Sequence, residues 1–135
     1  MKNWLQLFTI LLITGLTFTA CSDDEDDHGD NEVTINIISP TPDQVLSDAS
    51  SVTVKVEISA TDENHEIEII LHAEGDTSDE IIEADLHDHD QVVTFEQTVD
   101  LSSYPNGQEF HLEVFACEDH DCEERAFADV EFSIQ

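Results

Sequence analysis

The sequence predicts an all-β fold, a single seven-stranded β-sandwich formed by residues 33–135. In one segment after another, apolar and polar residues alternate with a period of two, which is typical of strands that bury one face. Turn residues separate these segments at regular intervals, as they do in β-sandwiches. No segment of this region shows the 3.6-residue period of an amphipathic helix. The length of the region suits one domain.

The first three strands are predicted by this alternation. Residues 33–39 carry apolar side chains at every second position, and two prolines then fix an extended corner. We expect a short return stretch at residues 45–46. The second strand is expected at residues 51–60 and the third at residues 66–73, with His72 on the outward face of the third.

Four further strands complete the predicted sandwich. A polar connection at residues 74–79 precedes the fourth strand, which leads into the tip His87-Asp88-His89-Asp90. The corner Tyr104-Pro105-Asn106-Gly107 precedes the sixth strand, because Pro presets φ and Gly accepts a positive φ. These four strands are expected at residues 82–86, 93–99, 110–116 and 128–134.

Residues 1–20 predict a cleaved signal peptide, since the apolar run after Lys2 is too short and too weakly flanked for a spanning helix. Phe18-Thr19-Ala20-Cys21 resembles a bacterial lipobox, although Leu is usual where Phe18 stands. This resemblance implies cleavage before Cys21 and lipidation of its thiol and amine, with acyl chains such as palmitate. The alternative is an ordinary signal peptide followed by an incidental cysteine.

Residues 21–32 predict an acidic tether. Ser22 and the five acidic residues after it resemble the surface-export signal of Bacteroidota lipoproteins. That resemblance implies a lipid-anchored protein of the outer membrane, exposed at the cell surface. The alternative is a plain solvated spacer, because a run of like charges repels itself and stays extended. Fully stretched, the tether reaches at most about 40 Å.

Two stretches of the domain resemble known modules. Asp100 to Gly107, followed by an alternating strand, is similar to a corner of bacterial immunoglobulin-like and fibronectin-type-III-like domains. Residues 38–43, followed by residues 51–58, are similar to the first two strands of those domains. The resemblance implies an immunoglobulin-like sandwich but no single function, because this fold serves adhesion, spacing and ligand capture. The core of antibody domains is excluded, since the only Trp, Trp4, lies in the signal peptide.

The charge of the chain restricts its partners. The formal net charge is −30, and loss of Lys2 with the signal peptide makes it −31. Only Lys55 and Arg125 remain as basic residues, which excludes nucleic acid as a partner. It also disfavours direct contact with anionic lipid, so we expect membrane association through the lipid anchor alone. Cations and basic partners fit this charge.

Cys117 and Cys122 form an even pair in an exported protein, which predicts a disulfide. Closing so small a loop contributes about 2 kcal/mol. The competing interpretation is a pair of thiolate metal ligands.

Histidines and carboxylates are predicted to meet at one end of the domain. In an immunoglobulin-like sandwich, the loops after the second, fourth and sixth strands share that end. Imidazole together with carboxylate suits Zn²⁺, Cu²⁺ or Ni²⁺, whereas carboxylate alone suits Ca²⁺. We therefore predict a divalent metal site, Zn²⁺ or Cu²⁺ before Ca²⁺; the alternative is three polar, exposed loops. The loops also supply Asp62 and Glu63, and the predicted ligands are His65, His87, His89, His120, Asp88 and Asp119.

A second metal site is predicted on a sheet face. If the third and sixth strands pair with Glu66 level with Cys117, His72 lies opposite His111. The last strand then brings Asp129 beside His111. A slip of one residue would destroy this row, and the alternative is a set of ordinary surface histidines.

The same face carries Ile70, Phe115 and Phe127, a small apolar patch suited to a protein or glycan partner.

No serine has the context of a nucleophile elbow, and no Gly-rich phosphate loop is present. We therefore expect no enzyme. The predicted function is a surface-anchored binding module that captures a divalent metal; the alternative is a structural or adhesive module without a specific metal.

Overall fold

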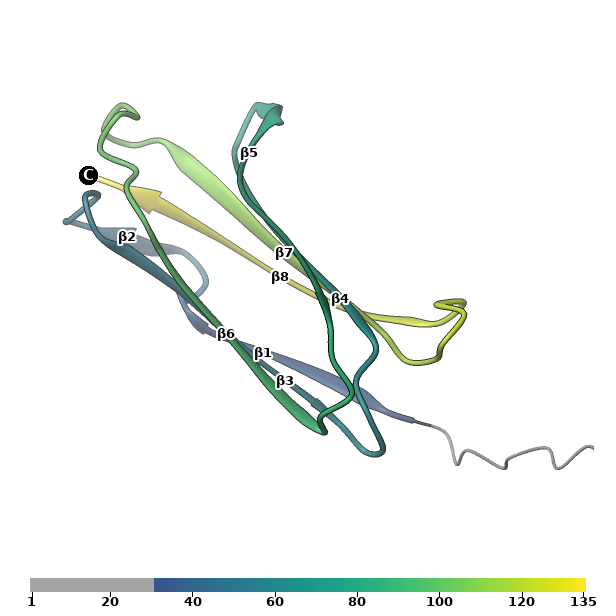
Figure 1. Ribbon diagram of the computed structural model, residues 1–135. Coiled ribbons are helices and arrows are strands. Elements are labelled where there is room, and N and C mark those ends of the chain that lie inside the picture. The colour runs from purple at the N-terminus through teal and green to yellow at the C-terminus, as the bar shows by residue number, and fades with distance from the viewer. Residues whose placement is uncertain (1–30) are drawn as a thin grey trace, which may run out of the picture.

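The structure of the protein, a computed structural model, describes residues 31–135, with backbone only at residues 76–79. It is an all-β sandwich of two sheets (Figure 1). No helix within residues 31–135 is long and apolar enough to cross a membrane. The predicted signal peptide, Cys21 and the tether up to residue 30 lie outside the described residues.

Eight strands make up the two sheets. One sheet has three strands in the order β1-β3-β6, and the other has five in the order β2-β8-β7-β4-β5. Neighbouring strands are antiparallel except for β2 and β8, which are parallel. The strands are β1 (Val33–Ser39), β2 (Gln44–Leu46), β3 (Val52–Ala60), β4 (Glu66–Ala73), β5 (Asp76–His87), β6 (Val92–Val99), β7 (Glu109–Cys117) and β8 (Arg125–Ile134).

The eighth strand is β2, the short return stretch expected at residues 45–46. It runs beside β8 because the corner after β1 carries the chain from one sheet to the other, and Asp43 N–H donates to Glu131 O at 2.8 Å.

The expected connection at residues 74–79 is wrong, because β5 begins at Asp76. Ala73 pairs with Asp76 across a two-residue turn in which Gly75 has a φ of +89°. The tight turn brings Asp76 back beside Ala73, but the next pair is His72 with Glu80, so residues 77–79 form an irregular stretch of β5.

The core lies between the sheets, as the alternation predicts. The inward rows of β3, β4 and β7 are buried, and Leu101 and Ile134 are buried at the end of the sandwich that holds the corner before β7. The predicted corner is confirmed, since Gly107 has a φ of +85° and its N–H donates to Ile134 O at 2.7 Å. The fully buried side chains of the inward rows include Val54, Val56, Ile58, Ile67, Ile69, Leu71, Leu112 and Val114.

Candidate metal centre

Three loops meet at the end of the sandwich where β1 begins: residues 61–65, 88–91 and 118–124. The first two are tied by backbone and side-chain hydrogen bonds. Asp88 N–H donates to His65 O at 3.1 Å, and Asn64 Nδ2 donates to Asp90 O at 2.6 Å. The predicted meeting of these loops is therefore present.

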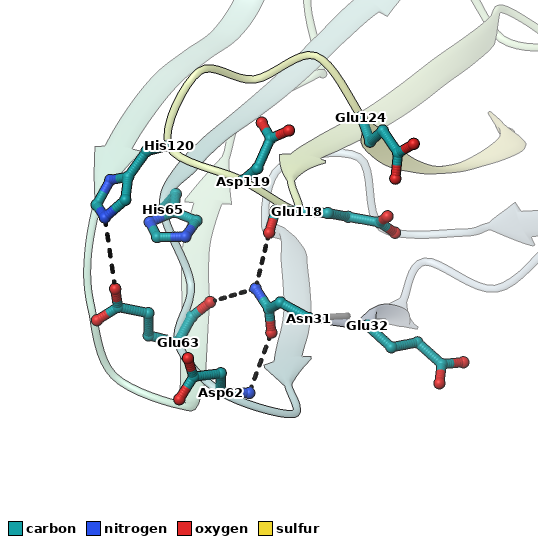
Figure 2. Close-up of a pocket in the computed structure, with 9 residues that line it drawn as sticks. All are labelled: Asn31, Glu32, Asp62, Glu63, His65, Glu118, Asp119, His120 and Glu124. Carbon is teal, nitrogen blue, oxygen red and sulfur yellow. Dashed lines mark hydrogen bonds and ion pairs between the residues drawn. The ribbon is translucent and has the colours of Figure 1, made fainter. Parts of the chain in front are cut away.

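Asn31 joins the first loop to the third. Its Nδ2 donates to Glu63 O at 2.8 Å and to Glu118 O at 3.0 Å. Its Oδ1 accepts from Asp62 N at 3.0 Å. One side chain at the end of the tether thus fixes the spacing of both loops (Figure 2).

The third loop is shaped by its own residues. Cys117 and Cys122 form a disulfide, with Cα atoms 4.8 Å apart. This pairing matches the first of the two interpretations of these cysteines. Asp119 Oδ1 accepts from Glu123 N at 2.9 Å, so this carboxylate holds the loop that carries His120.

Four histidine rings converge where the loops meet. The centroid of His65 lies 4.2 Å from that of His120 and 5.8 Å from that of His89. The His89 centroid lies 4.8 Å from that of His87. All four loop histidines predicted as ligands are therefore neighbours in space.

Glu63 lies among these rings. Its Oε2 is 3.4 Å from His89 Nδ1, and its Oε1 is 3.7 Å from His120 Nε2. One ligand atom from each of Glu63, His65 and His89 lies within 4.8 Å of the other two. Tetrahedral zinc with bonds of about 2.1 Å holds its ligand atoms about 3.4 Å apart. Small side-chain rotations that move these atoms by about an ångström would therefore bring them to coordination distance of one ion. We name Glu63, His65, His89 and His120 the loop-end cluster.

His65 is the buried member of the cluster. Its exposed fraction is 6%, and its Nδ1 has no hydrogen-bond partner. Burial, with the neighbouring His120 ring, lowers the pKa of His65 below its ordinary value of 6.5. The ring is therefore neutral at neutral pH, which is the form that binds metals.

Two predicted ligands have other uses in the structure. Asp88 Oδ1 accepts from Asp90 N at 2.8 Å, which forms the tip between β5 and β6. The carboxylate of Asp119 holds its own loop, as described above. Glu63 takes their place as the carboxylate of the cluster. Glu63 stands two positions before His65 in the loop that precedes β4, beside Asp62, so the sequence alone does not distinguish it from its acidic neighbours.

The loop-end cluster borders an open pocket of about 510 Å³ (Figure 2). Carboxylates dominate its lining, and neither Lys nor Arg contributes to it. The local charge therefore favours a cation over an anion. The lining residues are Asn31, Glu32, Asp62, Glu63, His65, Glu118, Asp119, His120 and Glu124.

The residues predicted for the sheet-face site also lie together. His72 is level with His111 in the pairing of β4 with β7, and the ring centroids are 5.4 Å apart. Glu131 is the direct partner of His111 on β8, but Asp129 reaches across, with Oδ2 2.9 Å from His111 Nε2. The predicted register between β4 and β7 is confirmed.

The predicted apolar patch centres on two aromatic rings. Phe115 and Phe127 are direct partners across β7 and β8, and their centroids are 4.8 Å apart. Phe127 is 52% exposed.

No protein-family model matches this chain, and no curated protein is detectably similar to it in sequence. Two solved structures of a β-glucosidase from Listeria innocua align with it, one in complex with glucose and one in complex with gluconolactone. The first is 13% identical over 76% of this chain with a TM-score of 0.40, and the second is 15% identical over 76% with a TM-score of 0.36. This chain spans 16% of the length of each. Similarity at this level carries no argument about function.

Proposed function

We propose that this protein is a surface-tethered binding module that captures a divalent transition-metal ion, Zn²⁺ or Cu²⁺, at its loop-end cluster. One observation carries the proposal. His65 is buried, and its Nδ1 lacks a hydrogen-bond partner although two more imidazoles and a carboxylate surround the ring. A buried nitrogen without a partner costs free energy, and coordination of an ion would remove that cost.

The ligand set selects the class of ion. Three imidazoles and one carboxylate match the ligands of protein zinc sites and also suit Cu²⁺. Ca²⁺ requires six to eight oxygen ligands, which a histidine-rich cluster does not supply. The surrounding carboxylates attract divalent cations toward the pocket.

Anchoring through Cys21 is the second part of the proposal. The lipobox-like residues before Cys21 and the acidic run after it support a lipid-anchored protein of the outer membrane. Cys21→Ala is expected to release the protein from the membrane fraction, because the acyl chains supply its membrane affinity. Cell fractionation followed by blotting measures this, with Ser22→Ala as the matched control. A Cys21→Ala protein that still sediments with membranes would contradict the anchor.

Metal capture is tested by calorimetric titration of the purified, metal-free protein with Zn²⁺ and Cu²⁺ near neutral pH. We expect a dissociation constant of about 1 μM or tighter, equivalent to about −8 kcal/mol. His89→Ala/His120→Ala should weaken this site at least about 100-fold, because it removes two of the four ligands. Both side chains are largely exposed, so their loss leaves the core unchanged.

Two variants serve as controls for this titration. His87→Ala removes a predicted ligand at the same end whose ring contacts His89 but lies outside the loop-end cluster. Phe115→Ser/Phe127→Ser removes the aromatic pair on the sheet face, of which Phe115 is half-buried and Phe127 is exposed. Both should bind Zn²⁺ within about threefold of wild type, since neither removes a member of the loop-end cluster. Affinity no tighter than about 100 μM in the wild type, or unchanged affinity in His89→Ala/His120→Ala, would falsify the proposal.

A further inference from the structure

We infer that the outer face of the five-stranded sheet holds a second, independent metal site, formed by His72, Glu74 and His111. These residues come from the end of β4, the turn after it and the start of β7. One ligand atom from each lies within 4.8 Å of the other two. Two imidazoles and a carboxylate form a ligand set for Zn²⁺, Cu²⁺ or Ni²⁺ that leaves coordination positions open for water.

The backbone fixes the three residues relative to one another. His72 and His111 are direct partners in the ladder between β4 and β7. Glu74 N–H donates to Glu109 O at 2.8 Å, and Glu74 O accepts from Gln108 Nε2 at 3.1 Å. The turn that carries Glu74 is therefore held against β7, beside the histidine pair. Sites on strands and tight turns of this kind need little reorganisation to bind an ion.

Each ring also has a carboxylate nearby. In many metal sites, a carboxylate that does not bind the ion orients the histidine ligand in this way. His111 Nε2 is 2.9 Å from Asp129 Oδ2, and donation of its proton leaves the lone pair of Nδ1 for a metal. His72 Nδ1 is 3.8 Å from Glu113 Oε2, within the range of an ion pair. His111 thus hydrogen-bonds a carboxylate through Nε2, and His72 has a carboxylate near its Nδ1.

The burial of His72 is the second indication of a ligand. Although it lies on the outer face of the sheet, its exposed fraction is only 7%. Its cross-strand partner on β5 is Glu80, and its partner on β7 is His111, so His72 lies between these two residues in the sheet. A buried imidazole among carboxylates presents a preformed donor to a cation.

The two sites are far enough apart to bind separately. Glu66 starts β4 at the loop end, and His72 lies six residues further along the strand, about 20 Å away. No residue of the loop-end cluster belongs to the sheet-face set. The wild-type protein should therefore bind two ions, with removal of either site leaving the other.

The test counts zinc ions per chain by native mass spectrometry, on the full chain carrying His89→Ala/His120→Ala. We expect one ion to remain, and the addition of Glu74→Gln or His111→Ala should weaken its binding at least about tenfold. Glu74 is exposed and contributes no core packing, so Glu74→Gln tests the site without a folding cost. Glu131→Gln, which changes the direct partner of His111, is the matched control and should bind like the parent.

Cu²⁺ provides a readout of the ligands themselves. Electron paramagnetic resonance of the His89→Ala/His120→Ala protein should show two coordinating nitrogens, reduced to one by His111→Ala. Complete loss of metal from His89→Ala/His120→Ala would overturn the second site while leaving the loop-end proposal intact. If the wild-type protein binds only one ion, and His89→Ala/His120→Ala still binds that ion, the loop-end proposal would be overturned instead.

Discussion

Replacing Phe110 with alanine is expected to lower the free energy of unfolding by about 3–5 kcal/mol. The ring is fully buried and stacks on Phe132 with centroids 5.3 Å apart. Tyr104 also contacts this ring in an edge-to-face arrangement, with centroids 5.1 Å apart. Truncation removes contacts that join the corner before β7 to the core and leaves a cavity there. For a domain of this size, the loss is a large share of a total stability of about 5–15 kcal/mol.

Urea unfolding followed by circular dichroism measures this change. Phe127→Ala is the matched control, because that ring is 52% exposed on the same sheet. It should cost about 1 kcal/mol or less. Equal losses for Phe110→Ala and Phe127→Ala would mean that the core is not where the structure places it.

Zinc is expected to stabilise the folded domain strongly, and acid is expected to abolish that effect. At a free zinc concentration about 100 times the dissociation constant, binding to the folded state adds about 2.7 kcal/mol. For a domain of about 100 residues, this raises Tm by roughly 10–20 °C. Thermal unfolding with and without Zn²⁺, at several pH values, gives the difference.

The sign of the pH dependence follows from the histidines. Metal and proton compete for the same nitrogen lone pairs, so the zinc-induced increase in Tm should shrink as pH falls below about 6.5. Burial lowers the pKa of His65, so the unfolded chain takes up a proton at His65 before the folded one does. This contribution to stability is complete above pH 6.5 and decreases as pH falls below that value, in the same direction as the loss of zinc. His89→Ala/His120→Ala should show a smaller zinc effect, and an equal one would contradict the cluster.

Local sequence pattern predicts the strands and the pairing of β4 with β7. Every inward position on those strands is apolar, so a shift by one residue would expose the whole row. The disulfide pair at the end of β7 also fixes where the last hairpin turns. For these reasons the neighbouring positions of His72 and His111 follow from the sequence alone.

The features that the sequence does not predict depend on contacts between distant segments. β2 is three residues long, and its pairing with β8 depends on where the corner after β1 directs the chain. β5 begins in polar residues because Gly75 permits a tight turn. The carboxylates of Asp88 and Asp119 resemble metal ligands by composition, but backbone N–H groups of their own loops occupy them. Only the folded loops distinguish Glu63 from its acidic neighbours.

The start of β1 lies at the same end of the domain as the pocket beside the loop-end cluster. Glu32 lines the pocket, so the chain enters the domain at the same end that carries the loop-end cluster. The predicted tether from Cys21 to this point spans at most about 40 Å when fully extended. A molecule anchored at Cys21 would therefore hold a captured ion within a few nanometres of the lipid headgroups, on the side of the domain nearest the membrane.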